Sequence, residues 1–255
     1  MTIGEMARRI ARIFLRGESA ERRLSPIEEI IYNEGERLIP GVTHGRKEFV
    51  RHRSSYEFFC RVIEADLAFA GTPEGSVPLE IIDLGCGVGH GCRRLARIGG
   101  ARITGVDASP ECIEYAERHY GGPEITYRRE DLARLIPLMP EYDYAVSRGV
   151  FEHIPGGLAL AVSGRWSRRL MFDVPYDEPP GSNPHHLLTG IREEHFAGFA
   201  GAELFYQDLD GIIYDRKNKP PKPNMILCVC SRPGLPPVTG GGIPFPLPAW
   251  REEEG

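Results

Sequence analysis

Residues 79–91 read LEIIDLGCGVGHG, an apolar run that leads directly into closely spaced glycines. Such a run, followed by a helix-forming segment, is typical of a β-strand that turns into a helix. Glycines let the backbone approach a ligand, and the first N–H groups of the following helix have no partner within that helix. The stretch therefore predicts a ligand-binding loop between a strand and a helix.

The spacing of the glycines restricts which class of ligand the loop can bind. From Gly85 they follow G-x-G-x-G, and Asp83 precedes them near the end of the strand. The dinucleotide fingerprint G-x-G-x-x-G would require glycine where His90 stands, because its third glycine allows close packing around a pyrophosphate. An acid at the strand end instead suits a ligand with an ammonium group. An NAD-type oxidoreductase is thus disfavoured, although it remains one alternative.

Outward from this loop, short apolar segments alternate with helical ones, which is typical of βαβ units and a parallel sheet. We therefore predict the α/β class, with a Rossmann-like, doubly wound, mostly parallel seven-stranded sheet. The last two strands lack an obvious helix between them, so an antiparallel hairpin is expected to close one edge. The predicted strands are 79–84, 102–107, 125–129, 142–147, 169–174, 202–208 and 225–231.

Helices and a tail are expected on either side of this α/β region. Residues 1–17 have the pattern of a basic amphipathic helix, a second helix should begin at Pro26, and a third should span 46–69. We predict a helical cap region at 1–76, a catalytic domain at 77–232 and a flexible tail at 233–255. The tail is rich in Pro and Gly and should not order itself without a partner. A protein partner or a second copy could bind at the first helix or the tail.

Composition excludes several classes of protein. There are 31 Lys and Arg against 36 Asp and Glu, a formal net charge of −5, so no global positive field attracts DNA. No apolar stretch is long enough to span a bilayer, and the start does not resemble a signal peptide, so a cytoplasmic protein is expected. The six cysteines lack C-x-x-C spacing, which favours reduced, buried thiols.

The first three predicted strands each end beside an acidic residue: Asp83, Asp107 and Asp131. Open α/β sheets bind ligands at this edge. Asp107 could accept hydrogen bonds from both hydroxyls of a ribose, and such charge-assisted bonds contribute about 1.5–3 kcal/mol each. Asp131 could accept from an exocyclic adenine amine. Each of the two could instead cap the helix that follows it.

With these motifs, residues 79–155 resemble a class I S-adenosylmethionine-dependent methyltransferase. The resemblance implies that the glycine loop holds the amino-acid end of S-adenosylmethionine, the second acid its ribose and the third its adenine. Arg148 stands where the family often has a small or amide residue. The implied cofactor-binding residues are Asp83, Gly85, Cys86, Gly87, Asp107, Ala108, Asp131, Leu132 and Arg148.

Two further stretches suggest where the methyl acceptor binds. Residues 147–154, SRGVFEHI, are similar to the family's small-residue turn followed by Glu-His, which lies near the sulfonium of the cofactor. Residues 183–186, NPHH, resemble a stretch in bacterial methyltransferases of surface-polysaccharide and small-molecule biosynthesis. We therefore expect in-line methyl transfer to the hydroxyl of a sugar, a glycan or another small molecule.

A hydroxyl acceptor needs its proton removed, and histidine, with an ordinary pKa of about 6.5, is the side chain best suited to this. His153 and His186 are the predicted catalytic residues; each could instead be structural, and His185 could replace the second. No metal site is predicted. The weaker alternative is a divalent ion held by Asp173, Asp177 and Glu178, after the fifth strand.

Other functions remain open at this stage. The Asn/Asp-Pro-Pro-Tyr element of base N-methyltransferases is missing after the fourth strand, which argues against DNA bases. RNA or protein substrates are alternatives to a small molecule. A non-catalytic protein that binds S-adenosylmethionine and a partner is a further alternative, since the first helix and the tail could both contact another chain.

Overall fold

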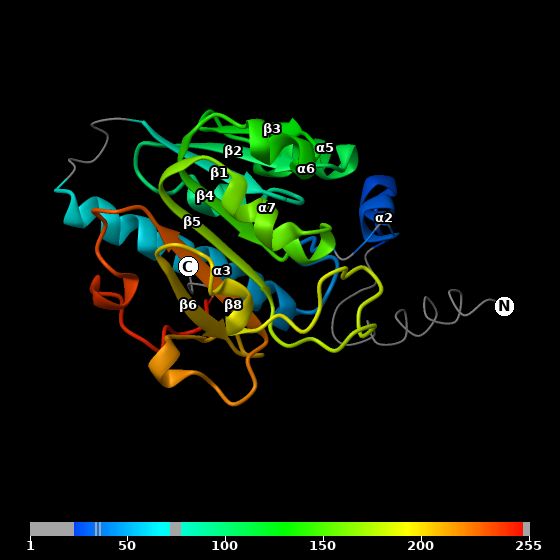
Figure 1. Ribbon diagram of the computed structural model, residues 1–255. Coiled ribbons are helices and arrows are strands. Elements are labelled where there is room, and N and C mark those ends of the chain that lie inside the picture. The colour runs from blue at the N-terminus through cyan, green and yellow to red at the C-terminus, as the bar shows by residue number, and fades with distance from the viewer. Residues whose placement is uncertain (1–22, 34, 36, 72–77, 252–255) are drawn as a thin grey trace.

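The computed structural model describes residues 23–33, 35, 37–71 and 78–251. The amphipathic helix predicted at 1–17 lies outside the described residues. One eight-stranded sheet, in the order β3-β2-β1-β4-β5-β8-β6-β7, forms the centre of the molecule (Figure 1). The strands are β1 (Leu79–Leu84), β2 (Ala101–Asp107), β3 (Ile125–Arg129), β4 (Tyr142–Arg148), β5 (Trp166–Pro175), β6 (Ala202–Gln207), β7 (Ile213–Tyr214) and β8 (Met225–Ser231).

The first five strands are parallel, and β8 runs antiparallel between β5 and β6. The predicted α/β class, the mostly parallel sheet and the antiparallel C-terminal strands are therefore confirmed. The sheet has eight strands rather than seven because the two-residue β7 pairs with β6 at the edge. A strand this short has no detectable alternation of apolar residues, so the sequence could not reveal it.

Helices cover both faces of the sheet, as a doubly wound fold requires. On one face pack α3, α4 and α5; on the other pack α6 and α7 (Figure 1). Helix α2 packs against α5. The helices are α2 (Pro26–Asn33), α3 (Arg46–Phe69), α4 (His90–Leu95), α5 (Pro110–Tyr120), α6 (Leu132–Leu135) and α7 (Gly157–Ser163), with short 3-10 turns η1 (Ile136–Leu138), η2 (Phe151–His153), η3 (Glu193–Phe196), η4 (Arg216–Asn218) and η5 (Val238–Gly240).

Helices α2 and α3 begin where the sequence predicted. Pro26 opens α2, and Ser25 and Glu28 exchange side-chain and backbone hydrogen bonds across its first turn. In α3, Phe58 and Phe59 are fully buried in the same cluster as β1 and β4. Helix α3 is thus part of the core of the sheet, and the boundary predicted at residue 76 does not separate a cap from that core.

The prediction of a flexible tail is wrong for residues 233–251. Phe245 stacks on Phe205 of β6 with ring centroids 5.1 Å apart, and Leu247 forms a β-bridge with Ile213. The amide of Trp250 donates to the hydroxyl of Ser54 on α3 at 2.8 Å. A few apolar side chains suffice because prolines restrict the unfolded chain and so lower the entropy lost on folding. The segment packs on its own domain.

The six cysteines are all buried and form no disulfide, as predicted. Within the described part of the chain, no helix has both the length and the apolar character that crossing a membrane requires.

Candidate functional site

A cavity of about 900 Å³ opens at the carboxyl ends of the parallel strands. Strand β1 lies between β2 and β4, so the chain order reverses there, and the helices that follow β1 and β4 pack on opposite faces of the sheet. One end of the cavity is lined by the loops after β2 and β3, and the other by residues 175–186 after β5. Every predicted cofactor-binding residue except Asp83 lines the cavity, and so do both predicted catalytic histidines.

The glycine loop after β1 forms one wall of this cavity. Gly85 and Gly87 have φ angles of +79° and +52°, in the left-handed region that favours glycine. A Cβ on Gly85 would overlap the side chain of Val150 after β4, so the two loops pack too closely for any other residue. A Cβ on Gly87 would meet nothing within 4 Å. The loop therefore leaves open space beside Gly87, where a ligand can approach the backbone.

Asp107 connects the glycine loop to the end of β2. Its Oδ2 accepts from the amide of Gly87 at 3.0 Å, and its Oδ1 accepts from the amide of Ser109 at 2.9 Å. Ser109, not Asp107, caps α5, since its hydroxyl accepts from the amide of Cys112. Asp107 is therefore held at the cavity wall by contacts other than a helix cap.

Asp131 does cap a helix, as the alternative interpretation allowed. Its Oδ1 accepts from the amide of Ala133 at 2.8 Å at the start of α6. The residue is exposed and lines the cavity together with Leu132 and Ala133. Capping the helix and lining the cavity are compatible, because both capping bonds use the same carboxylate oxygen, Oδ1.

Asp83 does not face the cavity, so the predicted direct contact with the ammonium group of the cofactor is not supported. Its side chain is fully buried on the α3 side of the sheet. Its carboxylate accepts from the hydroxyl of Tyr56 at 3.0 Å and from the thiol of Cys92 at 3.3 Å. Burial raises the pKa of Asp83 to about 7, despite the hydrogen bonds from Cys92 and Tyr56 that lower it. The carboxylate thus supports the loop from beneath.

His90 stands where a dinucleotide fingerprint would have its third glycine, and it lines the cavity. It is buried, and neither ring nitrogen has a hydrogen-bond partner among the described residues. Burial lowers its pKa well below the usual value, so the ring is neutral. A buried imidazole without partners is costly unless a ligand supplies them.

Helix α3 contributes a charged group that the sequence analysis missed. Glu48 lies 3.5 Å from Arg148 Nη2 and 3.4 Å from His52 Nε2. Burial alone would raise the pKa of Glu48, but the hydrogen bond with His52 and the charge of Arg148 hold it well below its usual range. Burial and the charge of Arg148 lower the pKa of His52 to about 3. Glu48 and His52 are four residues apart, about one helical turn, and this spacing could have identified the pair from the sequence.

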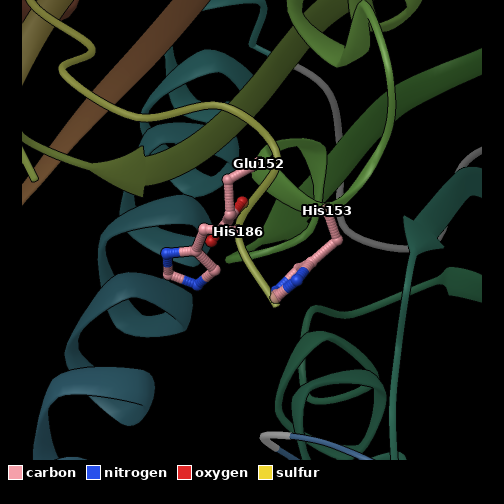
Figure 2. A group of neighbouring side chains, drawn as sticks. All are labelled: Glu152, His153 and His186. Atoms are coloured by element: carbon pink, nitrogen blue, oxygen red, sulfur yellow. The ribbon is translucent and has the colours of Figure 1, made fainter. Parts of the chain in front are cut away.

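The other end of the cavity gathers Glu152, His153 and His186. One ligand-type atom from each lies within 4.8 Å of the others, and the two imidazole rings have centroids 4.8 Å apart. Figure 2 shows the Glu152 carboxylate close to the two imidazole rings. The sequence therefore found both histidines, and the fold brings them together from segments after β4 and after β5.

Backbone hydrogen bonds explain why these distant segments meet. The amides of Leu187 and Leu188 donate to the carbonyl of Glu152 at 2.8 and 3.0 Å. Phe151, next to Glu152, is fully buried and packs edge-on against Phe172 of β5. The turn after β4 is thus anchored in the core, and the loop after β5 is held against it.

Each histidine also has a partner on its Nδ1 atom. His153 Nδ1 lies 3.0 Å from the carbonyl oxygen of His185, and His186 Nδ1 contacts Glu178. A carbonyl or carboxylate oxygen only accepts, so Nδ1 of each ring carries the proton. Nε2 of His186 then accepts from the side-chain amide of Asn183 at 3.1 Å.

The three acids of the alternative metal site do not converge. Asp173 is fully buried and accepts from the hydroxyl of Ser55 at 2.6 Å. Asp177 forms a two-bond ion pair with Arg192, and Glu178 contacts His186. Each carboxylate therefore contacts a different neighbour. The alternative of a metal site at these three acids is not supported.

Residues 81–170 match the model of the family described as "Methyltransferase domain". The ubiquinone biosynthesis O-methyltransferase of Chelativorans sp. (strain BNC1) is 30% identical over 174 residues, which cover 58% of this chain and 68% of that protein. The chain belongs to the S-adenosylmethionine-dependent methyltransferases. The predicted family, enzyme class and cofactor are thereby confirmed.

Other proteins are similar to this methyltransferase over part of their length. The ubiquinone biosynthesis O-methyltransferase of Methylocella silvestris is 30% identical over 161 residues, and the match spans 62% of its length, less than two thirds. The trans-aconitate 2-methyltransferase of Streptomyces avermitilis is 39% identical over 129 residues, 45% of each chain. Among solved structures, N-methyltransferase NodS from Bradyrhizobium japonicum, in complex with S-adenosylhomocysteine, aligns with a TM-score of 0.48 at 15% identity, covering 72% of this chain and 87% of that one.

The cavity of this methyltransferase suits its cofactor chemically. The open side of Gly87 admits a ligand to the backbone, and Asp107 and Asp131 offer acceptors for ribose and adenine at successive strand ends. The buried ring nitrogens of His90 offer polar partners at the glycine loop. Glu152, His153 and His186 also line the cavity, on segments that follow β4 and β5.

Proposed function

We propose that this enzyme transfers the methyl group of S-adenosylmethionine to an oxygen atom of a small-molecule acceptor bound beside His153 and His186. The observation that carries the proposal is the pairing of His186 with Glu178 on the cavity wall, opposite the glycine loop. Relatives named as O-methyltransferases support oxygen as the methylated atom. A sugar or glycan acceptor has no such support, so the proposal keeps only the small-molecule hydroxyl.

The residues at the glycine-loop end would hold the cofactor. Asp107 would accept from the ribose hydroxyls and Asp131 from the adenine amine, with Leu132 packed against the adenine ring. The backbone from Gly85 to Gly87, including Cys86, would face the amino-acid end. Ala108 and Arg148 complete this wall. Arg148 is already balanced by Glu48 and Asp173, so its role would be to position these elements and not to act as a free positive charge.

The chain's own residues would do two things during the reaction: align the acceptor and remove its proton. S-adenosylmethionine supplies an electrophilic methyl group on a positively charged sulfur. The cavity aligns the acceptor oxygen with that methyl group, and such alignment supplies much of the acceleration in a displacement reaction. The acceptor's proton leaves at the Glu152, His153 and His186 group. His186 Nε2 would accept this proton once the amide of Asn183 releases it, with Glu178 orienting the ring through Nδ1.

The test is an acceptor screen in which S-adenosylhomocysteine formation and the mass of the product are both measured. The acceptors should include phenols, catechols, hydroxy acids, sugars and amines of similar size. We expect O-methylated products from at least one hydroxyl acceptor. His186→Gln and His153→Gln should each lower kcat at least tenfold, as expected for loss of acid-base catalysis.

The matched control is His119→Ala, which removes an exposed histidine on α5 outside the cavity and should leave kcat unchanged. Methylation of amines alone, or full activity in both glutamine variants, would contradict the proposal. Binding of the cofactor without turnover on any acceptor would instead favour the non-catalytic alternative.

A further inference from the structure

The side chains proposed to remove the acceptor's proton, Glu152, His153 and His186, are also of the types that bind a metal ion. Glu152, His153 and His186 offer one carboxylate oxygen and two imidazole nitrogens, all within 4.8 Å of one another. Within the described part of the chain, no other set of three histidine, cysteine or acidic side chains converges in this way. Figure 2 shows the three side chains as neighbours.

We propose that Glu152, His153 and His186 together bind one divalent transition-metal ion, and that this ion activates the acceptor hydroxyl. The proposed role of the ion rests on the proposed function, whereas its binding can be tested without an acceptor. The site differs from the acidic set Asp173, Asp177 and Glu178 that the sequence offered.

The contacts behind the two histidines favour this assignment. A histidine that binds a metal usually donates its other ring N–H to a carboxylate or a backbone carbonyl, which fixes the ring and directs a lone pair at the ion. Here Nδ1 of His186 donates to Glu178, and Nδ1 of His153 donates to the carbonyl of His185 at 3.0 Å. Both rings are therefore tautomers with the lone pair on Nε2.

The segments that carry the ligands are held in place. Glu152 is buried, and its carbonyl oxygen accepts the amides of Leu187 and Leu188, which directly follow His186. Two ligands come from the turn after β4 and one from the loop after β5, so these hydrogen bonds fix the distance between them. Binding would also require the side-chain amide of Asn183 to give up its bond to His186 Nε2.

The donor set selects the kind of ion. Imidazole nitrogens suit Zn²⁺, Fe²⁺, Co²⁺ and Ni²⁺, whereas Mg²⁺ and Ca²⁺ prefer oxygen donors. Two histidines and one glutamate also make up the protein ligands of some catalytic zinc sites, in which a further position stays open for water or substrate. An ion held here would therefore keep at least one position for the acceptor oxygen.

The ion would change how the acceptor loses its proton. Binding of the hydroxyl oxygen to a divalent ion lowers the pKa of that hydroxyl. The O–H bond breaks and its proton goes to solvent; the oxygen then forms the new O–C bond while the S–C bond of S-adenosylmethionine breaks and S-adenosylhomocysteine leaves. The ion keeps its oxidation state. In this metal-loaded form His186 is a ligand and no longer the base.

The binding test uses Co²⁺, whose visible absorption reports its ligands, with Zn²⁺ calorimetry as a second readout. The full chain is first stripped of metal by a chelator and dialysis. We expect one Co²⁺ per chain in the wild type and in His119→Ala. Affinity should fall at least tenfold in His153→Ala and in His186→Ala. Glu178→Gln, which removes only the partner of His186, should weaken binding by about 10-fold to 100-fold.

Thermal unfolding of each variant shows whether it is folded. The variants at His153 and His186, which are less buried than Glu152, keep the test valid if Glu152→Gln fails to fold. Absence of Co²⁺ binding at millimolar concentration, or unchanged affinity in both histidine variants, would overturn the site.

Activity then tests the role of the ion separately. With an acceptor found in the screen, the metal-stripped enzyme should be at least tenfold slower, and added Zn²⁺ or Co²⁺ should restore the rate. An equal rate without the ion would overturn its role in the reaction. If the ion binds as expected but no hydroxyl is methylated, the proposed function fails while the metal site stands, so the two failures are distinguishable.

Discussion

The hydroxyl of Tyr56 donates to the carboxylate of Asp83 at 3.0 Å, and this bond joins helix α3 to the carboxyl end of β1. Tyr56 also lines the cavity together with the glycine loop, whereas Asp83 does not. Gly91, at the start of α4, packs against the same tyrosine ring so closely that it has no room for a Cβ. Tyr56 therefore supports the loop and α4 at once, and the position of the cofactor wall depends on it.

The buried Asp83 predicts a particular pH dependence of stability. Its pKa of about 7 in the folded protein exceeds the value of about 3.9 expected when unfolded. Between these values the folded state binds more protons, so the carboxylate makes the free energy of unfolding fall as pH rises from about 4 to 7. Asp83→Asn, which stays neutral, should remove this part of the fall.

Urea unfolding at pH 5 and pH 8 measures the effect for wild type and variant. Tyr56→Phe is the informative companion, because loss of a donor to the carboxylate should raise the pKa of Asp83 further and steepen the fall. The same difference between pH 5 and pH 8 in wild type and Asp83→Asn would contradict the assignment.

The two loop glycines should respond differently to a methyl group. Gly85→Ala combines a left-handed φ with overlap onto Val150, so it should lower the free energy of unfolding by about 2 kcal/mol or more. Gly87→Ala has only the φ cost, about 1 kcal/mol. Chemical denaturation measures both. Equal destabilisation by the two substitutions would show that the loops do not pack as described.

Substitution of the two acids on the cavity wall should weaken cofactor binding to different extents. Asp107→Asn removes a half-buried charge that also holds the Gly87 amide, so S-adenosylhomocysteine should bind at least tenfold more weakly. Asp131→Asn should have a smaller effect, because the residue is exposed. Calorimetric titration measures both, with Glu114→Gln on the exposed side of α5 as the control that should bind normally. A larger loss in Asp131→Asn than in Asp107→Asn would reverse the proposed roles.

The packed tail predicts a stability cost at its buried leucine. Leu247 is 3% exposed, so Leu247→Ala should lower the free energy of unfolding by about 2–4 kcal/mol. Leu138→Ala, at a side chain that is 85% exposed, should change it by less than about 0.5 kcal/mol. Urea unfolding compares them directly. If Leu247→Ala is as neutral as its control, the segment does not pack on the domain.

The sequence predicted most of the sheet because its strands are apolar runs separated by helix signals such as Ser109 and Pro110. It could not predict that Asp83 points away from the cavity. That direction depends on which face of β1 packs against α3, and here Asp83 shares the face of Ile81. The prediction for the tail was wrong because composition counts prolines and glycines but does not show the rings of Phe58 and Phe205 that Phe245 contacts.

The site was predicted as separate motifs and not as a constellation. His153 and His186 were chosen for their chemistry, but their meeting depends on backbone bonds between Glu152 and the loop after β5. Glu178 belonged only to the weaker alternative of a metal site, and the structure places it beside His186 instead. Such contacts between distant segments have no periodic signal in a sequence.

Thermal unfolding with S-adenosylhomocysteine, S-adenosylmethionine and NAD tests the central claim, that the cavity beside Gly87 and Asp107 binds the methyl donor. At about 100 times the dissociation constant, a ligand stabilises the folded state by about 2.7 kcal/mol, a rise of several degrees in Tm for a chain of this size. The account predicts this rise with both adenosyl sulfur compounds, a much smaller rise in Asp107→Asn at the same concentration, and none with NAD. An unchanged Tm with both compounds, or an equal rise with NAD, would contradict it.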